Sequence, residues 1–264
     1  MKKLQRIALL LFVMIMLACG KTSYAATEQF VQGDSLGDLN VQSEYEETEM
    51  IHNFQKDIDK YSESQIENIM MKKKIIEGNY SEVSLSDNTG ISLLAEDLIV
   101  KLDVEVVTQK NGYYCGPATT RQTLKYINGS APSQDTIAEA LGTTTAGTDG
   151  TKIVEYINKK QDKVVYMISS DLSVIGMQSK FANTMNANRV PIIGRLKFTT
   201  ADGWPYSTNG HFLNVTGYTT GMNKLRITDP NAQRVIEGSS GHYRIDFEKF
   251  RTATKNHFSQ HYYW

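Results

Sequence analysis

Apolar side chains recur along the chain at two spacings, and the change from one to the other predicts how the chain is organised. Between residues 44 and 77 apolar positions follow one another at intervals of three and four, most clearly at Ile51, Phe54 and Ile58. This spacing predicts amphipathic helices, since residues three or four apart share one helix face. Residues 81–97 are rich in Ser, Asp, Asn and Gly, and we interpret them as a linker.

Beyond the linker, helical patterns come first and strand patterns follow. After a strand over residues 98–107, the pattern predicts helices over residues 116–127, 133–142, 151–160 and 173–187. It predicts further strands over residues 164–169, 190–198, 211–218, 224–228 and 243–247. This order predicts an α+β domain, in which N-terminal helices pack on an antiparallel sheet.

The first 25 residues have the composition of a secretory signal peptide. Three basic side chains precede an apolar run over residues 7–18, which is too short to span a bilayer, since that takes about 20 residues. Small side chains at Ser23 and Ala25 favour cleavage before Ala26. A competing interpretation is lipidation at Cys19, because the four residues that end there loosely resemble a bacterial lipobox. Either route exports the protein, to the medium or to the bacterial cell surface, and we expect no transmembrane span in the mature chain.

The formal net charge of −1 hides a strong difference between segments. Residues 26–100 carry 16 acidic and 5 basic side chains, a net charge of −11, whereas residues 101–264 carry 19 basic and 13 acidic ones, a net charge of +6. The near-zero total argues against a protein built mainly to bind nucleic acid. We therefore expect a signal peptide (1–25), an acidic helical pro-segment or spacer with its linker (26–97) and a catalytic domain (98–264).

Cysteine usage singles out one residue. The chain has 2 cysteines, and if Cys19 leaves with the signal peptide, Cys115 keeps no disulfide partner in the exported chain. A lone cysteine is most often a small buried apolar residue. Cys115, however, stands at a predicted helix start before Gly-Pro-Ala, where the helix end stabilises a thiolate. Gln109 lies on the loop just upstream, where its amide is able to donate a hydrogen bond to an oxyanion.

A histidine and an aspartate stand at facing points of a predicted hairpin. His211 begins one strand directly after Gly210, and Asp229 ends the next strand, in the run Asp-Pro-Asn. With a turn over residues 219–223, hairpin geometry places Asp229 opposite His211 or diagonal to it, within reach of a carboxylate–imidazole bond. Together with Cys115, they predict a nucleophile activated by a base that a third group orients.

These residues are similar to those of the papain-like cysteine peptidases that process bacteriocin leaders, the peptidase C39-like family, and more closely of its stand-alone, exported members. The resemblance rests on Gln-x5-Cys-Gly-Pro-Ala, Gly-His and Asp-Pro-Asn, and it covers about residues 100–235. It implies a papain-like fold, with Gln109 as the oxyanion donor, Cys115 as the nucleophile, His211 as the general acid and base and Asp229 as the orienting residue.

Two features depart from the transporter-linked members of that family. No transporter or ATPase segment follows in this sequence, and the chain contains no Gly-Gly dipeptide at which a leader would be cut. The family's leader-peptide substrate is therefore not carried over. For substrate contacts we single out Gly112 and Gly210, which leave room for a peptide backbone, and Trp204, which either walls the site or packs its own loop.

Other histidines offer weaker alternatives. His242 is a rival base at a strand start, but no aspartate lies at the matching point of a hairpin partner. His257 and His261 are four residues apart, yet they lack the Glu and the third ligand of a zinc site. Nothing resembles a phosphate-binding loop, so we expect neither a metal nor a cofactor.

Two classes of function remain open from the sequence. The first is an exported cysteine peptidase that hydrolyses peptide bonds of secreted or cell-surface polypeptides, with a cell-wall amidase or endopeptidase as its variant. The second is a peptidase-like module that binds without turnover. The acidic helices predict a pro-segment that docks near Cys115 through Ile51, Phe54 and Ile58 and acts as an intramolecular inhibitor. A solvated spacer is the alternative.

Overall fold

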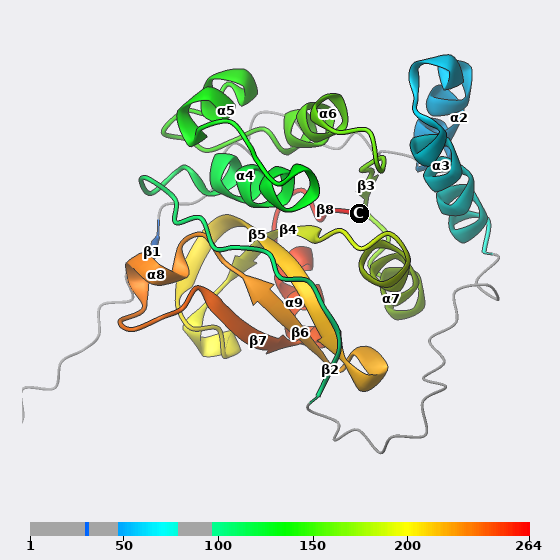
Figure 1. Cartoon of the computed structure of the whole chain (residues 1–264). Helices are drawn as coiled ribbons and strands as arrows, with labels where there is room; N and C mark the ends of the chain where they lie inside the picture. The colour runs from blue at the N-terminus through cyan, green and yellow to red at the C-terminus, as the bar shows by residue number, and fades with distance from the viewer. Residues whose placement is uncertain (1–29, 32–46, 79–96) are drawn as a thin grey trace, which may run out of the picture.

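The structure is a computed structural model that describes residues 30–31, 47–78 and 97–264. Its centre is a sheet with strand order β3 (Ile168–Ser169), β8 (Tyr262–Tyr263), β4 (Ile192–Phe198), β5 (Ser207–Thr219), β6 (Lys224–Thr228) and β7 (His242–Asp246) (Figure 1). Neighbours in this order are antiparallel, and β2 (Leu98–Lys101) also joins β5 antiparallel. A short strand β1 (Phe30–Val31) joins β5 in parallel. The predicted α+β class is confirmed.

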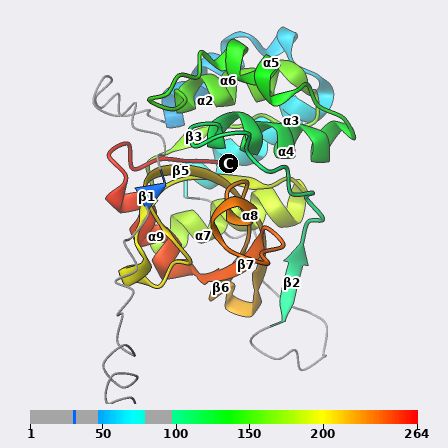
Figure 2. The ribbon, with the colours of Figure 1, turned by 90° about the vertical axis from the view of Figure 1, so that its left-hand side faces the viewer.

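Three helices cover one face of this sheet: α4 (Cys115–Asn128), α5 (Gln134–Leu141) and α6 (Gly150–Lys160) (Figure 2). They begin and end close to where the sequence predicts. The Ser133 hydroxyl accepts a hydrogen bond from the Thr136 backbone N–H at 3.1 Å, and Gly142 ends α5 in the left-handed conformation, with φ of 64°. Apolar residues of the three helices and of β5 form one of two buried cores.

The opposite face carries α7 (Val174–Ala182), which continues as a π-helical turn (Asn183–Ala187), and α9 (Phe247–Asn256). Phe181 contacts Phe247 and Phe250 edge to face, with ring centroids 6.2 and 5.7 Å apart. The sequence predicted a strand through residue 247, but β7 ends at Asp246. Phe247, Phe250 and Ala253 are buried at intervals of three, which one helix face satisfies and a strand does not.

Two predicted strands are shorter than expected. Of residues 98–107 only Leu98–Lys101 form regular strand, and of residues 164–169 only Ile168–Ser169. Backbone groups beyond these strands bond to other partners: the Leu102 N–H donates to the Thr216 carbonyl at 2.8 Å. Short elements complete the fold: α8 (Ala232–Val235) and single 3₁₀ turns at Ile58–Lys60, Thr200–Asp202 and Thr220–Met222.

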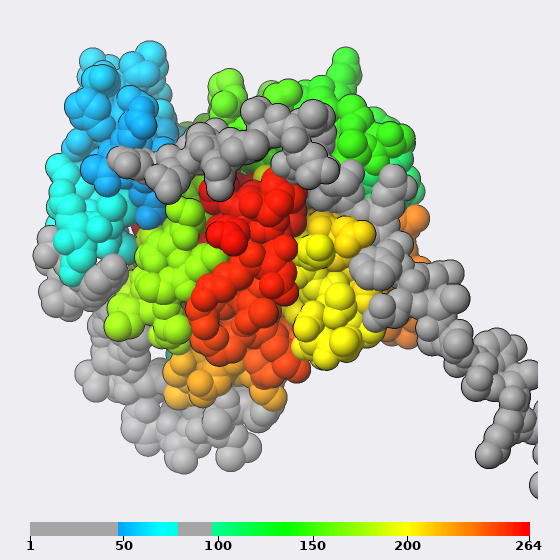
Figure 3. All heavy atoms as spheres, turned by 180° about the vertical axis from the view of Figure 1, so that it is seen from behind, coloured from blue at the N-terminus to red at the C-terminus, as the bar shows by residue number. Residues whose placement is uncertain are grey.

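The acidic segment forms a helical hairpin of α2 (Glu47–Lys56) and α3 (Glu63–Ile76) that packs on the rest of the chain. Figure 3 shows it, in blue and cyan, against α7 on the back of the molecule. Ile51, Ile69 and Ile75 are buried in the second core, together with residues of α7 and the sheet. The Asn68 side chain accepts a hydrogen bond from the Val165 backbone N–H at 2.9 Å. The hairpin is therefore part of the folded core and not a solvated spacer.

Charged side chains are buried where the hairpin meets α7. Lys180 is 2 % exposed, and its Nζ lies 2.7 Å from Glu47 Oε2 and 3.1 Å from Asp171 Oδ2. Glu47 Oε1 accepts a hydrogen bond from the Trp264 indole N–H at 2.9 Å, and Lys72 Nζ lies 3.8 Å from the centre of that indole ring. Burial lowers the pKa of Lys72 well below its ordinary value, against the opposing charge of Glu47. We call these five residues the seam cluster.

The hairpin lies at the end of the molecule opposite α8, as Figures 1 and 2 agree. Docking near Cys115 was therefore the wrong expectation for residues 47–77: α3 buries Gln65, Asn68 and Lys72 against the far side instead. The predicted signal peptide and all but the last residue of the linker lie outside the described residues. Among the described residues, no helix has the length and apolar composition needed to cross a membrane.

Candidate active site

The first turn of α4 presents Cys115 to the sheet. Cys115 is the first residue of the helix and is fully buried. Gly116 follows because the helix start passes close to Thr148: a Cβ on Gly116 would lie 2.5 Å from Thr148 Oγ1 and 2.6 Å from its Cβ. No larger residue fits there without moving Thr148. The glycine thus fixes how closely the helix that carries the thiol approaches its neighbours.

The hairpin of β5 and β6 brings His211 and Asp229 together. The observed register pairs Asn214 with Thr228 and Tyr218 with Leu225. Continued beyond Thr228, this register places Asp229 diagonal to His211, which is one of the two predicted positions. His211 Nε2 lies 2.8 Å from Asp229 Oδ1, and both side chains are buried. Sequence reasoning therefore located this contact correctly from turn position alone.

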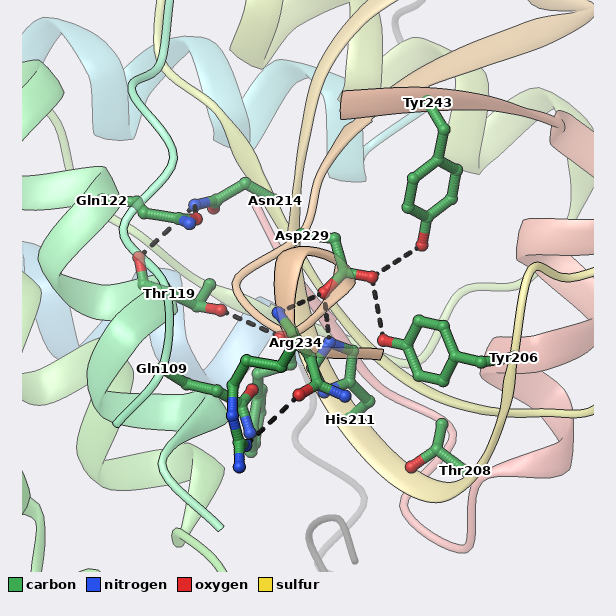
Figure 4. A network of polar contacts seen from close by, with 12 residues as sticks. Gln109, Thr119, Gln122, Tyr206, Thr208, His211, Asn214, Asp229, Arg234 and Tyr243 are labelled. Carbon is green, nitrogen blue, oxygen red and sulfur yellow. Dashed lines mark hydrogen bonds and ion pairs between the residues drawn. The ribbon is translucent and has the colours of Figure 1, made fainter. Parts of the chain in front are cut away.

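Asp229 receives hydrogen bonds on both carboxylate oxygens (Figure 4). Oδ1 accepts from His211 and from the Asn231 backbone N–H, each at 2.8 Å. Oδ2 accepts from the hydroxyl groups of Tyr206 and Tyr243, again at 2.8 Å each. We call His211, Asp229, Tyr206 and Tyr243 the Asp229 cluster. Four donors hold the carboxylate in one orientation and satisfy it in a buried place.

Burial and charge oppose one another in the pKa values of this cluster. Burial alone would lower the pKa of His211, but the Asp229 charge and hydrogen bonds to Asp229 and Cys115 raise it to about 10. Burial alone would raise the pKa of Asp229, but His211 and the donors around it hold it below its ordinary value. Burial and the Asp229 charge raise the pKa of Tyr206 and Tyr243 well above the usual range, so both stay protonated donors. The arrangement favours an imidazolium facing a carboxylate.

Cys115 lies on the other side of the imidazole. The hydrogen bond between His211 and Cys115 is one of the interactions that raise the His211 pKa. Because Asp229 occupies Nε2, the ring nitrogen that remains for the thiol is Nδ1. The three side chains therefore form a chain from thiol to imidazole to carboxylate, an arrangement in which a base is able to activate a thiol for attack.

Gln109 is buried on the loop before α4 and is tied to the Asp229 turn. Its backbone N–H donates to the Pro230 carbonyl at 2.9 Å, and its side-chain Nε2 donates to the Asn111 carbonyl at 2.7 Å. Gln109 is 2 % exposed, and within the described part of the chain no donor bonds to its side-chain Oε1. The loop thus fixes an amide between the Asp229 turn and the residues that lead to Cys115.

A second polar network aligns α4 with β5 (Figure 4). Thr119 Oγ1 donates to the Phe212 carbonyl at 2.9 Å, and Thr123 Oγ1 donates to Asn214 Oδ1 at 3.0 Å. Asn214 Nδ2 in turn donates to Gln122 Oε1 at 3.0 Å. The network joins the helix that carries Cys115 to the strand that carries His211 through fully buried groups, so it sets their relative position.

The remaining predicted site residues are placed less directly. Trp204 is 3 % exposed and stacks on Phe198 with ring centroids 4.0 Å apart, so it packs its own loop rather than presenting a wall to substrate. Gly112 is half-buried on the Cys115 loop, and Gly210 is buried beside His211. The rival base His242 bonds to Thr228 Oγ1 at 3.1 Å, and burial lowers its pKa.

Sequence reasoning missed the groups that support the reacting residues. Tyr206, Tyr243 and Asn214 were not predicted to support the site. The sequence does indicate the polar contact of α4. Polar residues at intervals of three and four on an otherwise apolar helix face predict a buried polar contact, and α4 has them at Thr119, Gln122 and Thr123. No local pattern predicts the contact of the two tyrosines with Asp229, because it depends on the separate paths of the loop before β5 and of β7.

A buried thiol at a helix start, facing a histidine that a carboxylate orients, is an arrangement typical of cysteine hydrolases. The model of the Peptidase_C39 like family matches residues 101–262, and the chain belongs to that family. No curated protein matches the chain.

The solved structures that are similar to the chain include the following three. The peptidase domain of Streptococcus ComA, a bifunctional ABC transporter involved in quorum sensing, is 21% identical over 61% of this chain and 96% of its own, with a TM-score of 0.40. A double-glycine motif protease from an AMS/PCAT transporter, in complex with the leader peptide, is 15% identical over 62% and 92%, with a TM-score of 0.40. A C39-like peptidase from Bacillus anthracis, itself described as putative, is 12% identical over 64% and 97%, with a TM-score of 0.44.

Proposed function

We propose that this protein is an exported cysteine peptidase that hydrolyses peptide bonds of polypeptides. The observation that carries the proposal is the placement of His211 between the Cys115 thiol and the Asp229 carboxylate. Family membership supports peptide-bond hydrolysis as the reaction class. A binding module without turnover would not require a buried histidine whose two ring nitrogens are both engaged in this way.

The proposed reaction has two halves. His211 already holds the proton as an imidazolium, and the Cys115 sulfur attacks the carbonyl carbon of the scissile bond as a thiolate. The carbonyl oxygen becomes an oxyanion, stabilised by the Gln109 amide and the Cys115 backbone N–H. The imidazolium then gives its proton to the leaving amine, and the C–N bond breaks to leave a thioester on Cys115.

Water completes the cycle. His211 removes a proton from a water molecule, which attacks the thioester carbon, and the proton passes to the departing sulfur as the C–S bond breaks. The products are an amine and a carboxylic acid, and the thiol is regenerated. Asp229 stays ionised throughout and stabilises the imidazolium, which agrees with a carboxylate whose pKa is held low by four donors.

The test measures release of fluorescent peptides from fluorescein-labelled casein by residues 26–264, which retain every described residue. We expect activity in this chain and none in Cys115→Ala, with unchanged circular dichroism and melting temperature in the variant. A matched control is Thr252→Ala, on α9 away from the site. Full activity in Cys115→Ala would contradict the mechanism. Release of wall peptides from purified peptidoglycan, without casein cleavage, would favour the cell-wall enzyme instead.

Export is a separate part of the proposal. The basic start, the apolar run over residues 7–18 and the small residues before Ala26 support secretion. We expect the culture medium to contain a chain that begins at Ala26, as read by N-terminal sequencing. A chain that remains in the membrane fraction and carries a lipid on Cys19 would favour the lipoprotein route.

A further inference from the structure

The strand that carries His211 is flanked differently along its two edges. On one edge β4 accompanies β5, from Ile192 opposite Val215 to Phe198 opposite Thr208. On the other edge β6 pairs with β5 only from Asn214 onward, where Asn214 faces Thr228. Asn214 also faces Ile193 of β4, so β4 and β6 lie on opposite edges of β5. The part of β5 before residue 214 is therefore left open by β6.

The short strand β1 occupies the start of this same edge. Val31 pairs with Thr208 and Phe30 with Ser207. Because Phe198 of β4 already faces Thr208 from one edge, β1 must lie on the other, in line with β6. Figure 2 shows β1, in blue, beside β5. Residues 209–213 of β5 form the gap between β1 and β6, and His211 lies at the centre of that gap.

This gap is also where the nucleophile approaches. Thr119, one turn along α4 from Cys115, donates a hydrogen bond to the Phe212 carbonyl within the gap. β1 is parallel to β5, so its direction leads from Thr208 toward His211. An extended peptide that continues in this direction would reach the level of His211 three residues after the one facing Thr208. Meanwhile Cys115 is fully buried and His211 is 1 % exposed, so neither is open to solvent in this arrangement.

We propose that an extended polypeptide substrate pairs its backbone with the edge of β5 that begins at Ser207 and Thr208, and that the chain's own Phe30–Val31 segment, which occupies this edge, competes with the substrate for it. This inference rests on the proposed function. Pairing by backbone hydrogen bonds recognises an extended chain with little regard to sequence. Two paired residues bind weakly on their own, but β1 is joined to the docked hairpin by only the 15 residues 32–46. Such a tether provides an effective concentration on the order of millimolar.

The first test locks β1 in place. In residues 26–264, Phe30→Cys with Ser207→Cys puts two thiols on facing residues of adjacent strands, a spacing that suits a disulfide. We expect the oxidised protein to lose at least about nine-tenths of its casein cleavage, and reductant to restore it. Iodoacetamide labelling of Cys115 in the oxidised protein, read by mass spectrometry, checks that the nucleophile itself survives. Lys224→Cys with Asp246→Cys, on the facing strands β6 and β7, is the control whose lock leaves cleavage unchanged.

The second test frees the edge. Val31→Pro removes a backbone N–H and disfavours strand pairing, whereas the control Val31→Thr keeps both the N–H and the branched shape. Because the segment competes with substrate, Val31→Pro should lower KM several-fold and leave kcat unchanged, and Val31→Thr should change neither.

Each outcome bears on a different step. Failure of the Phe30–Ser207 disulfide to form, while the control disulfide forms, would overturn the docking of β1. A locked protein that cleaves casein as fast as its reduced form would overturn the competition and leave the peptidase intact. Absence of cleavage in every variant and in the wild type would instead reject the proposed function.

Discussion

The Asp229 cluster and the seam cluster are built from similar parts in two separate regions of the molecule. In the first, His211 lies 2.8 Å from Asp229, and two tyrosines donate to the same carboxylate. In the second, Lys180 lies 2.7 Å from Glu47, and the Trp264 indole donates to that carboxylate. Each places an ion pair and aromatic donors where water is largely excluded.

The two clusters differ in what their cationic group is able to do. His211 carries a transferable proton and contacts the Cys115 thiol as well as Asp229. Lys180 is held between two carboxylates and joins α7 to the hairpin, whereas Lys72 of the hairpin lies against the Trp264 indole ring. Burial and a shifted pKa therefore do not identify a catalytic site by themselves. A candidate catalytic site also needs a group that carries a proton and contacts a possible nucleophile.

The largest expected effect is the loss of turnover in Asp229→Asn. The amide keeps the size of the carboxylate but removes the charge that stabilises the imidazolium and fixes the ring. We expect kcat for casein-derived peptides to fall about a thousandfold or more, with a smaller change in KM. Steady-state kinetics on purified protein provide the measurement. A loss below tenfold would show that Asp229 does not orient His211.

Lys180→Met should do the opposite, by reducing stability and sparing chemistry. The change leaves Glu47 and Asp171 without their shared cation at a largely buried place, which costs about 3 kcal/mol. Urea unfolding followed by tryptophan fluorescence measures this loss, and kcat of the folded protein should stay unchanged. Lys60→Met is the matched control, because the Lys60–Asp57 pair is exposed and contributes below about 1 kcal/mol. A seam variant that lost turnover while folded would erase the distinction between the clusters.

The pH dependence of stability and activity tests the pairing of His211 with Asp229. His211 binds its proton in the folded protein up to a pKa of about 10, against about 6.5 in the unfolded chain. Its contribution to stability is therefore complete below pH 6.5 and is lost as the pH rises toward 10. The alkaline limb of the kcat/KM profile should lie near that upper value and move down by more than one pH unit in Asp229→Asn. An unmoved limb would assign it to another group.

The smallest effect is expected from removing one tyrosine hydroxyl. Tyr206 and Tyr243 both donate to Asp229 Oδ2, so Tyr243→Phe leaves one donor in place. We expect kcat to fall several-fold in either single variant. The double variant should lose more than the product of the two single losses, because only then is Oδ2 left without a donor. Purely multiplicative effects would show that the two hydroxyls act independently.

Local signals along the sequence predicted much of the fold and one contact of the candidate site. Ser133 and Gly142 bound α5 as their side-chain chemistry requires, and β6 spans the predicted residues 224–228. The contact of His211 with Asp229 followed from the length of one turn. Such features depend on residues close together in sequence or joined by a single hairpin, so their geometry is nearly fixed by local rules.

What the sequence did not predict depends on distant segments. The acidic charge of the hairpin suggested docking on the basic site domain, but its position is set by buried groups such as Asn68 and Lys72, which match residues almost 100 positions away or more. The contact of Tyr243 with Asp229 likewise depends on the path of β7 through the sheet. Net charge is a property of whole segments and does not specify which face they meet.

The close approach of Gly116 to Thr148 has a consequence for how this family varies. A side chain at position 116 would overlap Thr148 Oγ1, Cβ and Cγ2 at 2.5, 2.6 and 2.9 Å. A chain with alanine at position 116 therefore needs a smaller residue at position 148 to keep the nucleophile's helix in place. Across relatives the two positions should therefore change together. A side chain gained at position 116 alone should displace the start of α4, which carries Cys115.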